Sequence, residues 1–416
     1  MSEQHEKALV PQIRFTGFTD PWEQRKLGDC GSAYGGLSGK TKEDFGRGTA
    51  KFVPYTNVFD NPITDSNRLE SIEKDSKQNE VRYGDALFTV SSETPGEVGM
   101  SSVWLSDQPN VYLNSFCFGY RQDGSFDSRY LAYMLRSQNV RSDLTLLAQG
   151  ISRFNISKNK VMELKVPYPG LKEQAQLGAF FDRLDSLITL HQRKYDKLCV
   201  LKKSMLDKMF PKGGSLYPEI RFAGFTDPWE QRKLGELASK RIEKNTNGIK
   251  ETFTNSAEHG VVSQLDYFDH DITNDANIGN YSVVHPDDFI YNPRISAVAP
   301  CGPINRNKLD RNGVMSPLYT VFSVDDTIDK LYLEHYFKTS RWHQFMFLEG
   351  NSGARSDRFS ISDSIFFEMP IQCPVLEEQE LIASFFGRLD SLITLHQRKL
   401  ELLRNIKKSM LDKMFV

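Results

Sequence analysis

The chain has 416 residues, 39% of them hydrophobic and 25% charged, which is enough for two or three domains with cores of their own. Its net charge of −2 excludes a uniformly basic protein, so any nucleic-acid contact must rest on local positive groups or on another subunit. The polar N-terminus, the lack of a long apolar run and five scattered cysteines predict a cytoplasmic protein with free thiols, and no membrane partner.

A block near the N-terminus returns almost unchanged in the middle of the chain. Residues 11–29 (PQIRFTGFTDPWEQRKLGD) correspond to residues 218–236 (PEIRFAGFTDPWEQRKLGE), and residues 181–210 correspond in the same way to residues 386–415. The two stretches between these blocks have about equal length but little obvious identity. A repeated frame around two unlike inserts predicts a scaffold that presents two different recognition surfaces.

Each insert is predicted to fold as an α+β domain. Runs rich in β-branched and aromatic residues predict strands at residues 51–58, 81–90, 111–120, 281–291 and 318–324. Each insert also has a short predicted helix, residues 127–137 and 329–340, with an Asp in the N-cap position. Residues 150–156 align with residues 355–361, so the two inserts share a plan while their loops differ.

Two long helices are predicted at residues 171–210 and 376–416. Apolar residues recur with the helical period along both segments, and about 40 residues correspond to about 60 Å of helix. Neither segment could leave such a stripe in water, so each needs a partner, and the obvious partner is the other copy. The predicted fold class is therefore α+β, with two domains related by a pseudo-two-fold axis and joined by an antiparallel coiled coil that brings the chain ends together.

Two features of these helices allow more than one interpretation. His191 and His396 lie near the helix midpoints inside the apolar stripe, so antiparallel packing should bring them to the crossing of the helix pair. Each is either a structural histidine whose ring nitrogens have hydrogen-bond partners in the seam between the helices or a proton-dependent switch. The apolar arc is wider than one seam needs, because Leu190, Leu201 and Leu206 flank it. Those residues are buried against the inserts or form a surface for other subunits.

Catalytic signatures are absent from the sequence. Residues 35–41 (GGLSGKT) are similar to a phosphate-binding loop, but Tyr34 stands where its first Gly is needed. Residues 292–295 (NPRI) lack the second Pro and the aromatic residue of an amino-methyltransferase segment, and no glycine-rich fingerprint for S-adenosylmethionine is present. The eight histidines form no metal-binding motif. The sequence therefore predicts a non-catalytic protein without its own cofactor or metal.

The whole chain resembles the specificity subunit of Type I restriction-modification enzymes. The resemblance rests on the paired blocks at residues 11–29 and 218–236, and on the helix openings at residues 171–174 (LKEQ) and 376–379 (LEEQ). It also rests on the Gly84-Asp85 and Asp287-Asp288 turns, each of which precedes an apolar strand end.

The resemblance implies two target-recognition domains, each reading one half of a bipartite, asymmetric site in double-stranded DNA. It also implies two methyltransferase (modification) subunits that bind S-adenosylmethionine and dock on this chain, and two restriction/translocase subunits. The helices would act as a spacer ruler, since half-sites on one face of DNA lie about 34 Å apart. The expected segments are an N-terminal segment near the end of helix two (1–20), target-recognition domain 1 (21–170), helix one (171–210), a linker (211–228), target-recognition domain 2 (229–375) and helix two (376–416).

Side-chain chemistry and position in loops predict the DNA-contacting residues, because Arg or Lys suits guanine and Asn or Gln suits adenine. In the first domain they are Ser38, Lys40, Thr41, Lys42, Tyr55, Asn57, Ser91, Ser92, Thr94, Gln149, Ser152 and Arg153. In the second domain they are Ser263, Gln264, Asn292, Arg294, Ser296, Arg306, Lys308, Ser352 and Arg355. Each could instead be a solvated loop residue or a phosphate contact, and Arg153 and Arg358 could be structural.

The sequence also permits a different function. Near-neutral charge and abundant Phe and Tyr also permit a coiled-coil adaptor whose two variable domains bind proteins. A stand-alone methyltransferase is disfavoured by the missing cofactor motifs. A complex that binds DNA should lose affinity steeply as salt rises, which separates it from the adaptor.

Overall fold

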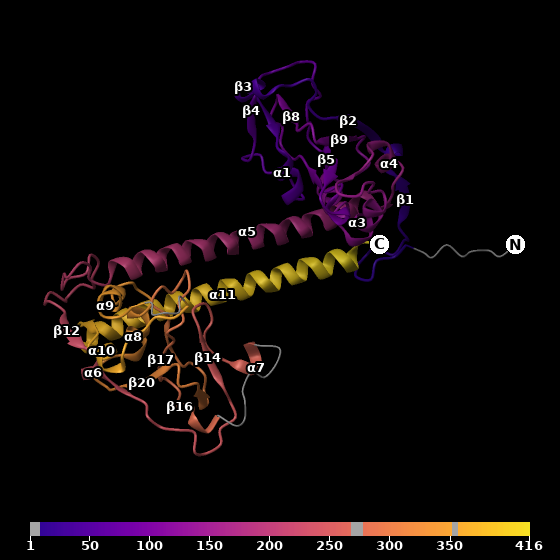
Figure 1. Ribbon diagram of the computed structural model, residues 1–416. Coiled ribbons are helices and arrows are strands. Elements are labelled where there is room, and N and C mark those ends of the chain that lie inside the picture. The colour runs from indigo at the N-terminus through magenta and orange to yellow at the C-terminus, as the bar shows by residue number, and fades with distance from the viewer. Residues whose placement is uncertain (1–8, 268–277, 352–356) are drawn as a thin grey trace. The chain divides into compact units, whose positions relative to one another are not determined.

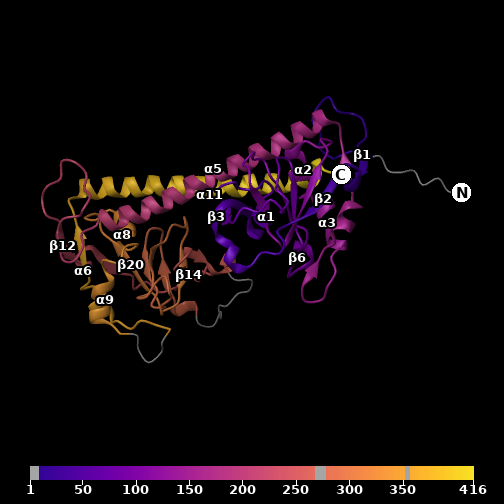
Figure 2. The ribbon, with the colours of Figure 1, turned by 90° about the horizontal axis from the view of Figure 1, so that it is seen from above.

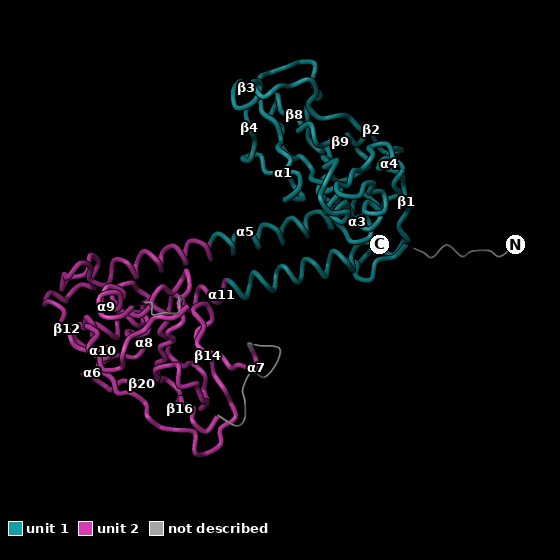
Figure 3. Tube along the Cα trace, viewed as in Figure 1, with its two compact units in different colours: residues 1–193, 397–416 teal, residues 194–396 magenta. Residues whose placement is uncertain are grey.

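The computed structural model describes residues 9–267, 278–351 and 357–416 (Figure 1). The chain divides into two compact units, which are coloured separately in Figure 3. Unit 1 contains residues 1–193 and 397–416, and unit 2 contains residues 194–396. Each of the two long helices therefore contributes one part to each unit.

Unit 1 is built around a four-stranded antiparallel sheet in the order β2-β9-β5-β7. A second sheet has the order β4-β3-β8, in which β3 runs parallel to β8. All four residues of β5 are buried, as expected for a strand that is covered on both faces. The strands of these sheets are β2 (Gly31–Gly35), β3 (Phe45–Val53), β4 (Glu70–Ile72), β5 (Ala86–Thr89), β7 (Ser101–Val103), β8 (Val111–Leu113) and β9 (Cys117–Gln122).

The short helices of unit 1 follow local capping signals. Asp127 caps α2, since its side chain accepts a hydrogen bond of 2.9 Å from the Tyr130 N–H. The strand predicted at residues 51–58 is wrong in its second half: β3 ends at Val53, and Pro54 occupies the N-cap of α1, where its missing N–H costs nothing. The helices are α1 (Tyr55–Asp60), α2 (Ser128–Met134), α3 (Gln138–Leu146) and α4 (Lys158–Met162), with short 3-10 turns at Leu27–Asp29, Lys42–Asp44 and Pro95–Glu97.

Unit 2 repeats the main sheet with different loops. Its four-stranded antiparallel sheet has the order β13-β20-β17-β18, and two-stranded sheets β14-β15 and β16-β19 accompany it. The strands are β13 (Ala238–Lys240), β14 (Phe253–Ser256), β15 (Gly260–Ser263), β16 (Ser282–Val284), β17 (Phe289–Tyr291), β18 (Ile304–Arg306), β19 (Gly313–Met315) and β20 (Thr320–Val324). The helices are α6 (Leu234–Leu237), α7 (Gln264–Tyr267), α8 (Lys330–Tyr336), α9 (His343–Glu349) and α10 (Asp363–Phe366), with a 3-10 turn at Ile278–Asn280.

The repeated block forms the same strand pair in both units. Its EQRK segment is β1 (Glu23–Lys26) in unit 1, which pairs with β11 (Lys165–Tyr168). In unit 2 the segment is β12 (Glu230–Lys233), which pairs with β21 (Pro370–Cys373). Because β11 and β21 lead directly into the long helices, each block ties the start of its domain to the helix that leaves it.

The long helices α5 (Leu171–Lys208) and α11 (Leu376–Met414) lie side by side (Figures 1 and 2). In unit 1, Lys407 donates to Asp185 at 2.5 Å, and Arg404 donates to Gln192 at 3.0 Å. Residue numbers rise along α5 while they fall along α11, which confirms the predicted antiparallel pairing. In unit 2, the pair continues with an ion pair between Lys202 and Asp390.

The two seam histidines lie in different units. His191 belongs to unit 1 and His396 to unit 2, and both side chains are partly buried. Their proximity therefore stays a prediction.

Each unit is closed by the end of the long helix that comes from the other half of the sequence. Phe415 is buried in the core of unit 1 and contacts the rings of Trp22, Tyr130 and Phe181. The repeated block lies there too, because the Ile13 N–H donates to the Lys413 carbonyl at 3.0 Å.

The same closure occurs in unit 2. Phe210 follows α5 and contacts Trp229, Tyr332 and Phe386, as Phe415 contacts their counterparts in unit 1. Two copies of one sequence frame therefore build two copies of one core.

Among the described residues, no helix is both long and apolar enough to cross a membrane. All five cysteines lie in the described part of the chain and are free thiols. Burial raises the pKa of the Cys117 thiol to about 12, so this side chain behaves as a small apolar group in the core.

Candidate nucleic-acid interface

A buried ion pair fixes the repeated block against the long helix in each unit. Arg14 donates to both carboxylate oxygens of Glu173 at 2.7 and 2.8 Å, and Trp22 Nε1 donates to the same carboxylate at 3.1 Å. In unit 2, Arg221 donates to both oxygens of Glu378 at 2.8 Å. These contacts explain why the PEIRF-like blocks and the helix openings recur together in the sequence.

The Gly84-Asp85 and Asp287-Asp288 turns have a structural role. The Asp85 carboxylate is buried, accepts the Arg82 N–H at 2.9 Å and binds the guanidinium of Arg121. These contacts hold the turn that begins the central strand β5.

Asp288 repeats this arrangement in unit 2. It is buried, accepts the His285 N–H at 2.8 Å and binds Arg241. The preceding residue has a positive φ in both units, 84° at Gly84 and 69° at Asp287, so the same left-handed turn starts β17.

Unit 1 has a pocket of about 350 Å³ where three loops meet. Aromatic, hydroxyl and charged side chains line the pocket together. Its lining residues come from α1, from the segment that begins with β6 (Ser91–Ser92), from the turn after β8 and from the loop before β10 (Phe154–Asn155). They are Tyr55, Thr56, Phe59, Ser91, Ser92, Glu93, Glu97, Phe116 and Arg153.

Hydrogen bonds within the loops hold the pocket's shape. Tyr55 donates its hydroxyl to the Ser91 carbonyl at 2.7 Å, and its ring stacks on Phe59 with centroids 5.9 Å apart. Glu97 accepts from the hydroxyls of Ser92 at 3.1 Å and Thr94 at 2.8 Å. The walls of the pocket are therefore ordered by contacts that the chain makes with itself.

Four of the predicted DNA-contacting residues of the first domain line this pocket: Tyr55, Ser91, Ser92 and Arg153. They are far apart in sequence, and the pairing of β6 with β10 brings them together, with Phe154 opposite Ser92. Thr94 and the exposed Gln149 and Ser152 lie in the same loops but do not line the pocket.

The other candidates of the first domain are used elsewhere. Asn57 is fully buried and donates to the carbonyls of Asp65 and Arg68, which is a structural role. Ser38, Thr41 and Lys42 are exposed in a separate loop. In that loop Lys40 forms an ion pair with Asp75 at 2.9 Å, so its charge is already partly neutralised.

Three candidates of the second domain are structural. Ser263 is buried at the end of β15, and Gln264 Nε2 donates to the Phe253 carbonyl at 3.3 Å. Asn292 is buried, donates to the Asn255 carbonyl at 2.7 Å and accepts the Arg294 N–H at 3.0 Å.

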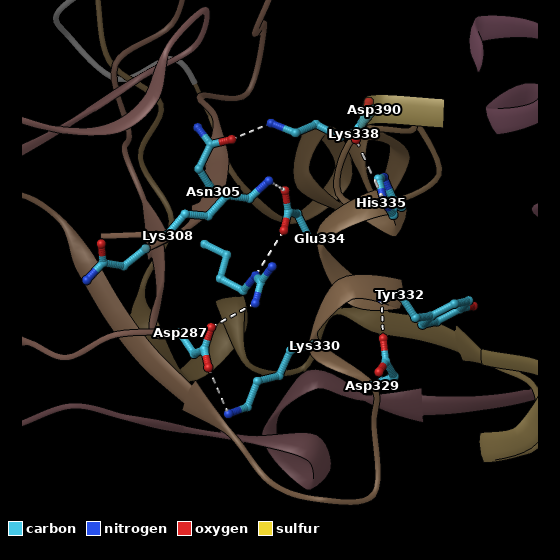
Figure 4. Close-up of polar contacts among 12 residues, drawn as sticks. Asp287, Asn305, Lys308, Asp329, Lys330, Tyr332, Glu334, His335, Lys338 and Asp390 are labelled. Atoms are coloured by element: carbon cyan, nitrogen blue, oxygen red, sulfur yellow. Dashed lines mark hydrogen bonds and ion pairs between the residues drawn. The ribbon is translucent and has the colours of Figure 1, made fainter. Parts of the chain in front are cut away.

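Arg306 and Lys308 belong to an ion-pair network, part of which is drawn in Figure 4. Arg306 donates to Glu334 at 2.9 Å and to Asp287 at 2.7 Å, and Lys308 also pairs with Glu334. Burial opposes the charge on Glu334, but Lys308 and Arg306 together hold the pKa of this carboxyl below its ordinary value. Both basic residues therefore have an internal anion as partner.

Arg294 is the exposed basic candidate of the second domain that makes no ion pair within the described residues. It forms an isolated antiparallel bridge with Arg358, at the place where β6 pairs with β10 in unit 1. The Ser296 hydroxyl accepts the Ala299 N–H at 3.2 Å in the loop that follows. Ser352 and Arg355 lie outside the described residues.

Sequence reasoning indicated the loop that contains Glu93 but missed Phe59, Phe116 and Glu97 in the walls of the unit 1 pocket. Phe116 is 60% exposed, and its N–H donates to the Asn114 side chain in a turn between β8 and β9. An aromatic residue directly after the turn-forming Asn114-Ser115 pair was the available signal. Phe59 was missed because the prediction placed the preceding residues in a strand.

Comparison with known proteins decides the family. The family model for the Type I restriction modification DNA specificity domain matches residues 19–199 and, a second time, residues 226–405. The chain belongs to this family. The two matched segments contain the two copies of the four-stranded sheet, so the repeat in the fold is a repeat of the specificity domain.

Relatives of the same kind match over most of the chain. The Type I restriction enzyme MjaVIII specificity subunit of Methanocaldococcus jannaschii is 22% identical over 350 residues, which cover 80% of this chain and 78% of that protein. The crystal structure of the Type I restriction-modification system S subunit from M. genitalium superposes with a TM-score of 0.59 and 13% identity, covering 98% of this chain and 99% of the other. The fold is therefore that of an S subunit.

A Type I specificity subunit is a non-catalytic DNA-recognition subunit. The pocket in unit 1 offers hydrogen-bonding groups and aromatic walls, which suit recognition. Within the described residues, no group of three or more His, Cys, Asp or Glu side chains is placed to hold a metal ion.

Proposed function

We propose that this specificity subunit reads a bipartite, asymmetric DNA sequence, with residues 21–170 reading one half-site and residues 229–375 the other. The observation that carries the proposal is the repeated sheet, β2-β9-β5-β7 and β13-β20-β17-β18, with unlike loops on the two copies. Equal frames with different loops suit two readers of different sequences. Membership of a DNA-recognition family favours this function over an adaptor that binds proteins.

In each unit, an arginine without an ion-pair partner among the described residues lies beside the β6–β10 strand junction or its counterpart, although the two arginines are on opposite strands of it. Arg153 in unit 1 precedes β10, and Arg294 in unit 2 forms the bridge that corresponds to the β6–β10 pair. Arginine is the side chain best suited to guanine, because its planar fork donates to O6 and N7 together. This placement gives each domain one candidate for reading guanine.

We propose that two methyltransferase subunits dock on the long helices and bind S-adenosylmethionine themselves. Each unit has a groove beside its part of the helix pair, of about 650 Å³ in unit 1 and about 590 Å³ in unit 2. Both grooves are bordered by the Asp–Lys ion pair that joins α5 to α11. Exposed leucines on the helices add apolar surface for a partner: Leu187, Leu190, Leu201, Leu392, Leu395 and Leu402.

We further propose how the assembled complex is completed and how it spaces the two half-sites. Two restriction/translocase subunits join the methyltransferase complex, which works on DNA in the cytoplasm. The long helices set the number of unread base pairs between half-sites, and a helix of 38 residues is about 57 Å long. A near-neutral chain can still bind DNA if partner subunits hold the phosphates and this chain contacts base edges.

An exchange of one domain tests the function. Residues 21–170 are replaced by those of another specificity subunit, and the chain is co-expressed with its methyltransferase subunits. The methylated sites should change in one half and keep the other half and the gap. The matched exchange of residues 229–375 should change the opposite half. A change in both halves after one exchange, or in neither, contradicts the proposal.

A further inference from the structure

Two exposed side chains of opposite charge line the unit 1 pocket. Arg153 and Glu93 both border the same volume of about 350 Å³. Among the described residues, neither of them forms an ion pair. A cation and an anion that share a pocket without pairing leave both groups available to a ligand that has acceptors and donors.

The position of Arg153 is built by its loop. The N–H and carbonyl of Gln149 pair with those of Asn155 at 2.9 and 2.8 Å, which closes the loop that carries Arg153. Gly150 has φ of 142°, and a Cβ at this position would collide with the Arg153 carbonyl oxygen. The turn therefore requires glycine and holds the backbone of Arg153 at the pocket.

Glu93 is placed by the neighbouring loop. It directly follows β6, whose Ser92 pairs with Phe154, the residue after Arg153. The next carboxylate along the chain, Glu97, is occupied by the hydroxyls of Ser92 and Thr94. Glu93 is the carboxylate of the pocket that keeps its acceptor oxygens free within the described residues.

Charge decides which part of DNA suits this pocket. A phosphate would be attracted by Arg153 but repelled by Glu93 and Glu97, which line the same volume. The edge of a base pair is uncharged and presents acceptors and donors together. A G·C pair offers the O6 and N7 acceptors of guanine and the N4 amino donor of cytosine in the major groove.

We propose that Arg153 and Glu93 read one G·C base pair in the half-site recognised by unit 1. Arg153 donates to O6 and N7 of the guanine, and Glu93 accepts from the N4 amino group of the paired cytosine. The stacked rings of Tyr55 and Phe59 form the pocket wall behind them. This assignment rests on the proposed function, since it names the base pair that one reader contacts.

The test uses the full chain in complex with its methyltransferase subunits. The wild-type site is first found by sequencing methylated DNA. Binding is then measured against a panel of duplexes in which each base pair of both half-sites is replaced in turn. Variants Arg153→Ala and Glu93→Gln are compared with Lys158→Ala and Glu43→Gln, which change exposed charges of the same unit outside the pocket.

Arg153→Ala should reduce the preference for G·C at one position of one half-site by about tenfold or more. Glu93→Gln should weaken discrimination at that same base pair. Both control variants should leave every base preference as in the wild type. Thermal unfolding of all four variants should match the wild type, because the four side chains are exposed.

Other results overturn the assignment. If Arg153→Ala weakens all duplexes equally and lowers the salt dependence by about one counterion, Arg153 contacts a phosphate. Unchanged preferences, or effects of the two variants at different base pairs, also contradict it. A wild-type complex that binds DNA without any sequence preference would instead refute the proposed function itself.

Discussion

Arg14 and Glu173 form a two-point ion pair across 159 residues of sequence, with donor–acceptor distances of 2.7 and 2.8 Å. The side chains are 12% and 3% exposed, so the pair is largely withdrawn from water. It joins the first block of the repeat to the opening of α5, and Arg221 and Glu378 do the same for α11.

Loss of Arg14 should destabilise unit 1 strongly. Arg14→Ala leaves the Glu173 carboxylate buried with the Trp22 indole as its remaining side-chain donor, which should cost about 3 kcal/mol of unfolding free energy. The control is Arg25→Ala, which breaks an exposed pair with Glu23 and should cost less than about 1 kcal/mol. Urea unfolding of both variants measures the difference. Equal, small effects would show that the buried pair does not hold the block in place.

The end of each long helix should matter for the core that it closes. Phe415→Ala removes a buried ring from unit 1 and should cost about 3 to 5 kcal/mol, and Phe210→Ala should cost a similar amount in unit 2. Phe116→Ala is the control, because that ring is 60% exposed. Proteolysis of each unit, followed by mass spectrometry, reports which core has loosened. A stable Phe415→Ala variant would contradict the closure of unit 1 by α11.

The two units differ where a short helix contacts the long helix. Tyr133 on α2 donates its hydroxyl to Asp185 at 2.9 Å. Its counterpart on α8 is His335 (Figure 4), whose Nε2 lies 4.0 Å from the Asp390 carboxylate. Within the described residues, both ring nitrogens of His335 are buried and have no hydrogen-bond partner.

This histidine predicts a loss of stability in mild acid. Burial, followed by the charge of Lys202, lowers the pKa of His335 to about 4, while Asp390 and Glu334 oppose the shift and Lys308 adds to it. The folded state therefore keeps the ring neutral, and the unfolded state takes up a proton below about pH 6.5. Stability should be complete above that pH and fall as the pH drops toward 4, by about 2 kcal/mol at pH 5.

His335→Tyr should remove this acid sensitivity, since the new side chain does not titrate in this range and corresponds to Tyr133. Urea unfolding of wild type and variant at pH 7.5 and pH 5 gives the comparison. The difference in free energy between the two proteins should change in favour of the variant as the pH falls. A constant difference would show that His335 is protonated equally in the folded and unfolded states.

The ruler role of the helices predicts a change in the gap between half-sites. Four residues are inserted in α5 after Arg193 and four in α11 after His396, which keeps the antiparallel pairing. The added 6 Å is close to two base pairs, so the gap should grow by one or two. Four residues inserted between the exposed Gly213 and Gly214 form the control and should leave the gap unchanged. An unchanged gap after the helix insertions would refute the ruler.

The sequence predicted the frame better than the reading loops, and the reason is physical. The long helices are predictable because apolar residues recur with the helical period over about ten turns. The apolar stripe on each copy indicates that each helix needs a partner. The strand at residues 51–58 was half wrong because Pro54 stops β3 and starts α1, a local signal that the apolar run obscured.

The tertiary environment distinguishes the candidates that are free to contact DNA from those that are already paired. A single sequence does not show this environment. Lys40 and Arg306 have the right chemistry for DNA but are paired with Asp75 and Glu334. Arg153 is unpaired among the described residues and meets Tyr55 only after β6 and β10 join. Residue type was predictable from the sequence, whereas availability depends on tertiary contacts.

Sequencing of methylated bases in DNA from cells that carry the complex tests the central claim most directly. Two copies of one frame with unlike loops predict a site with two different short elements, separated by a constant number of unspecified base pairs. A single uninterrupted motif, two identical elements or a variable gap would contradict two unlike readers held by one scaffold.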